Sequence, residues 1–549
     1  MRGLQFRVTH TESGKRSTTV HNKAIISAHA AALGTPESVA TIQGIRTEKN
    51  WRFSYMPHLV KAAGLSAAAS APAAVAMASA GLDAAIDAFE FYAADGSVVS
   101  LAAAMGLADA GATGAAADAV ADTESESPSI PTEFVSVVVR GTAALGDVTL
   151  RVPYLEGGGA ALEGAALVAE VEKWASAGAM EPSCAASIAR VAANSAWLDL
   201  RAQPAFVLLG ATSEMGPLEF LLERGATVVA VARPGSAKWD KLIAAARASP
   251  GTLIVPIPAA SAAMVAGSTA GGSDAAAADG GIERAADDVV AAAAGCDLLT
   301  QTPAIARWLV GVRPAEAVTV CSHVYLDGEA FVRASIAMDV VVRVMELHRA
   351  VPPSLAYIDT PSHAHAVPPS VLATAQRHLD ARPLWQRVCR LFGVLKDTRV
   401  APCGALGGAA PGEPWHVVDM LSPVQGPNYA VAKLIQRWRA IVAMADPQRM
   451  VSINTGPPAR TVSVMHSATM AAAINGFTWI PPNVAYEPTT VSPLMAALLL
   501  NDLNTPRPLA AHPLRTVYDG AWHGGSWCCP YDPHSSGKVA FLAGKLSGN

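Results

Sequence analysis

Apolar residues in the second part of the chain follow two alternating patterns. Short runs of β-branched and other apolar residues are separated by longer segments in which apolar residues recur every three or four positions. This alternation is typical of a parallel β-sheet whose strands are joined by crossover helices. The predicted strands are residues 206–210, 227–232, 252–257, 297–300, 318–322, 355–359, 416–421 and 451–454. The predicted helices are residues 217–224, 329–347, 370–379, 429–443, 467–474 and 492–503.

The first part of the chain has a hairpin pattern instead. Residues 88–102 contain two β-favouring runs around Asp95-Gly96, a dipeptide that favours a tight turn. A second hairpin is predicted from the runs at residues 133–141 and 147–154.

These patterns divide the chain into three regions. We predict a small α+β module of unknown function over residues 1–160 and a helical connector over residues 161–202. A parallel-sheet domain with insertions and a loop-rich tail is predicted over residues 203–549.

Composition and charge narrow the classes of partner. The chain has 40 Lys and Arg against 45 Asp and Glu, for a net charge of -5, so it lacks the basic footprint of a nucleic-acid-binding protein. Its apolar stretches are rich in alanine and interrupted by polar residues and prolines, which disfavours a membrane span. Seven cysteines without CxxC spacing favour a reducing compartment and offer no clear metal site. We expect a cytoplasmic protein, although the basic, acid-poor first 31 residues also permit an organellar transit peptide. The oligomeric state stays open.

The first strand of the predicted parallel sheet leads into a glycine-marked turn, GATSEMG. Gly210 ends the strand, and Gly216 lies where the next helix begins. Such a turn exposes backbone amides and the positive end of a helix to a phosphate, so Thr212 and Ser213 join the two glycines as candidate cofactor contacts. Glu214 stands where a middle glycine would let the backbone approach a pyrophosphate. A purely structural turn is the alternative.

The second strand indicates which dinucleotide would bind. It ends in Arg233, where an acidic residue would hold the ribose hydroxyls of NAD. An arginine there favours a 2′-phosphate, so NADP is expected in preference to NAD. The predicted fold is α/β, a Rossmann-like doubly wound parallel sheet preceded by the smaller α+β module.

A second motif, NYAVAK, places Tyr429 four residues before Lys433 on a predicted helix. Residues at this spacing share one helix face. A tyrosine has a pKa near 10, and a neighbouring ammonium would lower it and favour proton exchange at neutral pH.

From residue 206 to 461 the chain resembles the short-chain dehydrogenase/reductase superfamily. The resemblance is carried by GATSEMG, CDLLTQTPAI, NYAVAK and VSINTGPPART. It implies that Tyr429 is the general acid/base, that Lys433 is its electrostatic partner and binds the nicotinamide ribose, and that a serine holds the substrate oxygen. The usual serine position is occupied by His416, so Ser422, which directly follows the same predicted strand, is the candidate.

Two readings of function follow from this resemblance. The first is an NADP-dependent oxidoreductase acting on a carbonyl or alcohol of a small molecule. The second is a catalytically inactive relative that serves as a scaffold or binds a protein partner. It is favoured by Glu214 and by Thr302-Pro303-Ala304, which replaces the asparagine-alanine-glycine turn of the family. Whether residues 355–359 or 416–421 form the fifth strand stays open at this point.

Overall fold

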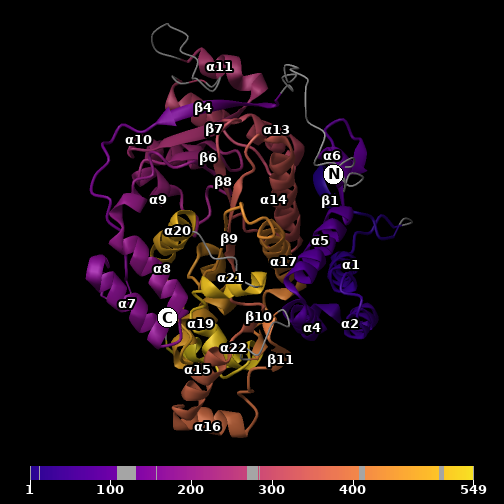
Figure 1. The fold of residues 1–549 in the computed structure, drawn as a ribbon. Coiled ribbons are helices and arrows are strands. Elements are labelled where there is room, and N and C mark those ends of the chain that lie inside the picture. Colours follow the sequence, from indigo (N-terminus) through magenta and orange to yellow (C-terminus); the bar gives the residue numbers. More distant parts are fainter. Residues whose placement is uncertain are drawn as a thin grey trace.

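A computed structural model describes residues 2–10, 13–107, 132–155, 158–268, 282, 285–406, 414–505 and 512–547. It is a mixed α/β structure built around one central, mostly parallel sheet (Figure 1). The N-terminal helices lie to one side of this sheet, and α16 projects at the opposite end from β4 (Figure 1).

Within the described residues the central sheet has seven strands in the order β13-β9-β8-β5-β6-β7-β4. Six of them are parallel, and β4 pairs antiparallel with β7 at one edge. The strands are β4 (Phe134–Arg140), β5 (Ala205–Leu209), β6 (Thr227–Val231), β7 (Thr252–Pro258), β8 (Val318–Ser322), β9 (Ser354–Asp359) and β13 (Val451–Thr455).

Helices cover both faces of this sheet, which explains why its inner strands are rich in apolar residues. Along β5, Val207 and Leu209 belong to one hydrophobic core, whereas Phe206 and Leu208 belong to another. The first core is completed by α13 (Thr302–Gly311), α14 (Glu329–His348) and α17 (Gly426–Ala443). The second is completed by α7 (Gly164–Ser176), α8 (Pro182–Ala193), α9 (Leu218–Glu223), α10 (Ser236–Arg247), α12 (Asp287–Ala293) and α20 (Pro488–Asn504).

The N-terminal region adds helices and a small antiparallel sheet to the first of these faces. The hairpin predicted around Asp95-Gly96 is confirmed, because β2 pairs with β3 there and β1 pairs with β2. Gly81 allows α5 to approach α17 closely, since a Cβ at this position would lie 2.6 Å from the Trp438 ring. The elements are β1 (Gly3–Phe6), α1 (Thr18–Ala31), α2 (Pro36–Thr47), α3 (Trp51–Ser54), α4 (Met56–Ala68), α5 (Ala71–Asp87), β2 (Phe89–Tyr92), β3 (Val98–Ser100) and α6 (Leu101–Ala104).

Two strand predictions were wrong. The second hairpin does not form, because β4 pairs with the distant β7 and residues 147–154 contribute only an isolated bridge from Val152 to Leu162. Residues 297–300 form a turn, because the Asp297 side chain accepts hydrogen bonds from the amides of Leu299 and Thr300. A short polar side chain that binds nearby amides competes with a strand in this way.

The fifth position of the parallel sheet belongs to β9. The strand predicted at residues 416–421 is β12, and it lies in a separate antiparallel sheet of order β10-β12-β11. This sheet belongs to an excursion between β9 and α17 that also carries two helices. Its elements are β10 (Ala364–Val367), α15 (Pro369–Asp380), α16 (Leu384–Leu391), β11 (Val400–Gly404) and β12 (Trp415–Asp419).

A helical cap follows β13 and ends the chain. Its helices α19 and α22 are packed backbone to backbone, since a Cβ on Gly476 or Gly544 would lie within 2 Å of a carbonyl oxygen of the other helix. The predicted loop-rich tail is thus partly helical. The cap comprises α18 (Val462–Met465), α19 (Ala468–Asn475), η5 (Phe477–Trp479), α21 (Pro513–Asp519), η6 (Ser526–Cys528) and α22 (Pro533–Leu546).

Candidate functional site

A cavity of about 1040 Å³ lies at the carboxyl ends of the parallel strands. Its walls include Gly210 after β5, Arg233 after β6, His323 after β8, Asp359 at the end of β9 and Gly456 after β13. The cavity spans the boundary between β5 and β8, where the strand order changes direction. Open α/β sheets bind ligands in the crevice at such a point.

The turn after β5 requires a glycine at its first position. Gly210 has a φ of +97°, and a Cβ there would lie 2.8 Å from the Val324 backbone nitrogen. The amides of Gly210 and Ala211 both donate to the Val231 carbonyl, which fixes the turn against β6. Neither the backbone conformation nor the space tolerates a larger residue.

Of the other three residues predicted to contact the cofactor in this turn, two line the cavity and one does not. Thr212 and Ser213 line the cavity. Gly216 is set back from its wall, where its amide donates to the Ser213 carbonyl at 2.9 Å. The following helix, α9, has only six residues, so its dipole is weaker than that of a long helix.

Glu214 turns towards the loop after β13. Both of its carboxylate oxygens accept from the Val462 amide, at 2.9 and 3.2 Å. This amide opens α18, so the carboxylate is used as a cap and joins the turn to the loop across the cavity. Part of its negative charge is therefore compensated by a protein donor.

Two cations stand at the end of β6. Arg233 is exposed and lines the cavity, and Lys238 lines it from the first turn of α10. Within the described residues neither forms an ion pair. Sequence patterns missed Lys238, although it lies five positions after Arg233 on the predicted crossover segment.

Tyr429 and Lys433 lie on α17 and both line the cavity. The Tyr429 hydroxyl hydrogen bonds with Thr360, and its ring packs 5.5 Å from the Phe331 ring. Burial raises the pKa of Tyr429 although this hydrogen bond opposes the shift. The expected lowering of its pKa by Lys433 does not occur, and the hydroxyl stays protonated at neutral pH.

Lys433 is bound to neighbours other than Tyr429. Its ammonium donates to the Ile358 carbonyl at 2.8 Å and to the Gln436 side chain at 3.1 Å. Burial lowers its pKa to about 8, although the nearby Asp359 carboxylate opposes this shift. It is therefore largely protonated at neutral pH, although its protonated fraction is smaller than that of an exposed lysine.

A buried ion pair fixes the end of β9 beneath this lysine. Asp359 accepts from the Arg437 guanidinium at 2.8 Å, and Arg437 also donates to the Ala364 carbonyl. Both side chains are buried, so removing one would leave an uncompensated charge.

His323 is a cavity residue that sequence patterns missed. It directly follows β8, and its amide donates to the Leu209 carbonyl at 2.9 Å. Burial and the charge of Lys433 lower the pKa of its imidazole to about 3, so the ring is neutral. The available signal was its position immediately after an apolar strand, at the edge where ligands bind.

Ser422 also reaches the cavity, from the segment after β12. Its carbonyl accepts a hydrogen bond from the Tyr55 hydroxyl at 3.2 Å. All three predicted catalytic residues thus share one cavity, although the hydrogen-bond partners of Tyr429 and Lys433 are other residues.

The helical cap lines the cavity with apolar side chains and with polar ones such as Thr469, Ser536 and Lys538. The apolar ones include Met470 and Ile474 from α19, Phe477 from η5, and Phe541 and Leu542 from α22. A ligand in the cavity would have polar groups at the strand ends and these apolar side chains on the cap, which is the usual composition of a small-molecule site.

The described residues offer neither a metal site nor a membrane-spanning helix. No group of three or more His, Cys, Asp or Glu side chains in them is arranged to hold a metal ion. In this part of the chain no helix is long and apolar enough to cross a membrane.

No protein-family model, no curated protein and no solved structure matches this chain.

Proposed function

We propose that the protein binds NADP in this cavity and transfers hydride between the cofactor and a carbonyl or alcohol carbon of a small molecule. The observation that carries the proposal is the strand order β7-β6-β5-β8-β9-β13, with the cavity at the boundary between β5 and β8. In chain order these are the third, second, first, fourth, fifth and sixth parallel strands. This is the order of dinucleotide-binding Rossmann sheets, so it supports the Rossmann-like reading and the resemblance to short-chain dehydrogenases/reductases.

The residues along the cavity fit the parts of such a cofactor. The close-packed turn at Gly210 suits a diphosphate, because it brings backbone rather than side chain to the cavity. Arg233 and Lys238 are cations at the end of the second parallel strand, where the adenosine ribose would bind, and two cations there favour a 2′-phosphate. The volume of about 1040 Å³ is at the upper end of the roughly 300–1,000 Å³ usual for ligand sites, which leaves room for a substrate beside the cofactor.

NADPH would supply the hydride when it is bound, and side chains of the protein would donate the proton. Tyr429 stays protonated, so its hydroxyl can give a proton to the carbonyl oxygen as the carbon accepts hydride. Thr360, which hydrogen bonds with this tyrosine, would then stabilise the phenolate until a proton returns from solvent. Lys433 would add its charge only after its ammonium exchanges Ile358 and Gln436 for the tyrosine. Ser422 would orient the substrate oxygen.

The alternative is a protein that binds but does not turn over a substrate. It is favoured by Lys433, whose ammonium is bonded to Ile358 and Gln436 rather than to Tyr429. Such a protein would keep the cofactor site and lack the proton transfer.

Titration of the purified protein with NADPH and NADH, followed by cofactor fluorescence and melting temperature, tests the proposal. We expect NADPH to bind at micromolar concentration and more tightly than NADH. Absence of binding at millimolar NADPH would refute both the enzyme and the cofactor-binding alternative.

A further inference from the structure

Helix α16 presents its most apolar side chains to solvent. Leu384, Val388 and Leu391 are spaced to share one helix face, and all three are exposed. The exposed face continues into the next turn with Phe392 and Val394. The exposed fractions of Leu384, Leu391 and Phe392 are 75%, 81% and 76%. A surface helix normally shows the opposite arrangement, with polar residues facing water. We call these five residues the apolar face of α16.

The orientation of α16 is fixed by its inner side. The Gln386 amide donates to the Trp479 carbonyl at 3.2 Å and accepts from the Tyr531 hydroxyl at 3.3 Å. The Trp385 ring lies 6.5 Å from the Trp479 ring, and Cys389 packs with Trp385 against a buried cluster. Because the polar Gln386 is buried and satisfied, turning the helix to bury its apolar face would break these contacts. The exposure is built into the fold.

The segment that carries the apolar face is positively charged. Between residues 377 and 399 the chain has six cations and two carboxylates, in contrast to its overall net charge of -5. Two of these cations are already in ion pairs, Arg390 with Asp397 at 2.7 Å and Arg399 with Asp419 at 3.7 Å. The cations are Arg377, Arg382, Arg387, Arg390, Lys396 and Arg399.

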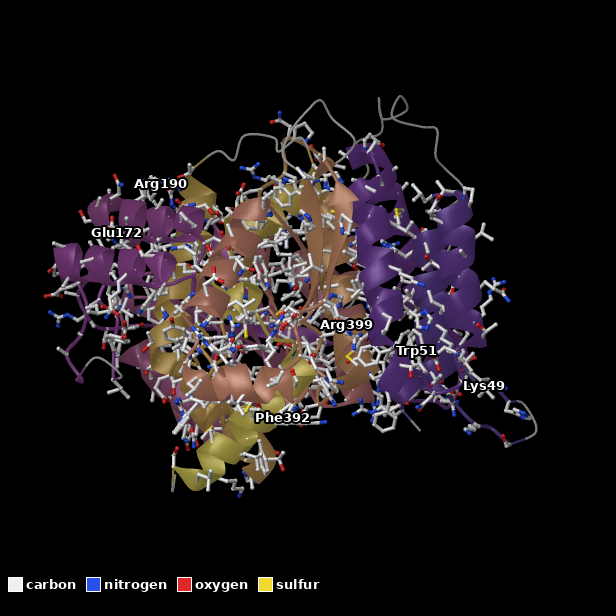
Figure 2. All side chains as sticks on the ribbon, turned by 90° about the horizontal axis from the view of Figure 1, so that it is seen from below. Lys49, Trp51, Glu172, Arg190, Phe392 and Arg399 are labelled. Carbon is white, nitrogen blue, oxygen red and sulfur yellow. The ribbon has the colours of Figure 1, made fainter. Side chains whose placement is uncertain are left out.

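The position of α16 favours a broad, flat partner. It projects from one end of the molecule (Figure 1). Seen from that end, Phe392 and Arg399 lie between the N-terminal helices that carry Trp51 and the helices that carry Glu172 (Figure 2). A second copy of the chain docked through the same face would bring arginines against arginines, which opposes a symmetric dimer.

We infer that the apolar face of α16 docks on the surface of an anionic lipid bilayer. Short amphipathic segments with leucine and phenylalanine on one face and arginine beside them insert at the boundary between headgroups and acyl chains. Anionic headgroups complement the cations of this segment, and each basic residue near such a surface contributes about 1 kcal/mol, or about fivefold in affinity. This mode of binding needs no membrane-spanning helix.

Docking would place the cap of the cavity close to the lipid. The inner side of α16 contacts Trp479 of η5, and Phe477 of the same turn lines the cavity. Trp479 is itself exposed and aromatic, as is common for residues at a membrane interface. The inference does not depend on the proposed cofactor, since none of the five residues lines the cavity.

Co-sedimentation of the full chain with vesicles tests this inference. We expect the protein to bind vesicles of phosphatidylcholine with phosphatidylserine at 0.15 M salt, and to bind at least tenfold more weakly to phosphatidylcholine alone. The double variant Leu391→Ser with Phe392→Ser should lose at least tenfold in affinity, and Arg387→Ala with Lys396→Ala should lose most of the preference for the anionic lipid.

The matched control is Val39→Ser with Phe53→Ser, which changes two side chains of similar exposure, 62% and 66%, in the N-terminal helices. It should bind vesicles like the parent protein. The inference would be overturned if the control lost as much vesicle affinity as the Leu391→Ser, Phe392→Ser variant. Absence of vesicle binding by the parent protein would also overturn it. So would concentration-dependent dimerisation in analytical ultracentrifugation that the Leu391→Ser, Phe392→Ser variant abolishes, because the face would then belong to a second copy. NADPH binding measured on the same variants should not change.

Discussion

The two sides of the cavity differ in whether their polar side chains already have hydrogen-bond partners in the protein. On the side of β6, Arg233 and Lys238 stand at the surface beside a turn whose geometry is fixed by Gly210. On the side of α17, Tyr429 and Lys433 are partly buried and bonded to Thr360, Ile358 and Gln436. The first side is prepared to receive an anion, whereas the second must exchange internal hydrogen bonds before it can act on a substrate. Binding and reaction should therefore fail separately. Variants that separate the two sides come first, in order of decreasing expected effect, and a pH test of Lys433 follows them.

Tyr429→Phe removes the hydroxyl from the reaction side. If this hydroxyl is the proton donor, NADPH oxidation with a panel of aldehydes and ketones should fall by about 10²- to 10⁴-fold, because general acid catalysis contributes about that factor. The affinity for NADPH should change by less than about twofold. The measurement is NADPH absorbance for turnover and fluorescence for binding.

Tyr325→Phe is the matched control for this variant. Its ring lies in the same cavity, 6.3 Å from the Tyr429 ring, but its hydroxyl bonds to Asp327. If Tyr325→Phe lowered the rate of NADPH oxidation as much as Tyr429→Phe, the result would contradict the role of Tyr429 as the proton donor. Cofactor binding without turnover by the parent protein would support the non-catalytic alternative.

Gly210→Ala changes the turn on the side of the cavity that would bind the cofactor. The added Cβ combines an unfavourable backbone conformation with a 2.8 Å contact to the Val324 backbone, so the free energy of unfolding should fall by roughly 2–5 kcal/mol. NADPH binding should be lost even where the variant remains folded. Urea unfolding and cofactor titration measure the two effects. Gly96→Ala is the control, since its φ is +87° but nothing lies within 4 Å of its Cβ, and it should cost about 1 kcal/mol.

Arg233→Ala with Lys238→Ala tests the choice of cofactor. The loss of charge-assisted hydrogen bonds to a 2′-phosphate should weaken NADPH binding by about 10- to 100-fold and leave NADH binding nearly unchanged. Lys241→Ala, on the same helix but outside the cavity wall, should have no effect on either cofactor. Equal weakening of NADPH and NADH would show that these cations do not read the 2′-phosphate.

Lys433→Met probes the buried ammonium through pH. Burial lowers the pKa of Lys433 to about 8 from 10.5, so the unfolded chain binds more protons between these values. The free energy of unfolding of the parent protein should therefore rise relative to the variant as pH increases from 8 to 10.5, by up to about 3 kcal/mol. Denaturant unfolding at several pH values measures this difference. A constant difference across the window would mean that Lys433 is not desolvated.

The parallel strands could be predicted because they are buried on both faces and most of them are rich in apolar residues. The missed features depend on contacts between distant residues. The run at residues 133–141 looks like half of a local hairpin, but its partner is β7, which lies beyond two other strands in the chain. The predicted strand at residues 297–300 failed because Asp297 captures two amides that a strand would need elsewhere.

The candidate site was predictable where a residue carries a motif and not where only the fold brings it in. Gly210 and Tyr429 are marked by spacing in the sequence, and both line the cavity. Lys238 and His323 have no motif, and their position follows only from the sheet order. The bonds of Lys433 were equally hidden, because its partner Ile358 lies on β9, far from it in sequence.

Determination of an experimental structure of the protein with NADPH tests the central claim most directly. We expect density for the cofactor along the ends of β6, β5 and β8, with its diphosphate over the Gly210 turn and its 2′-phosphate beside Arg233 and Lys238. The nicotinamide should lie on the side of the cavity that carries Tyr429. A cavity without cofactor at saturating NADPH, or a cofactor bound elsewhere on the molecule, would contradict the proposed function.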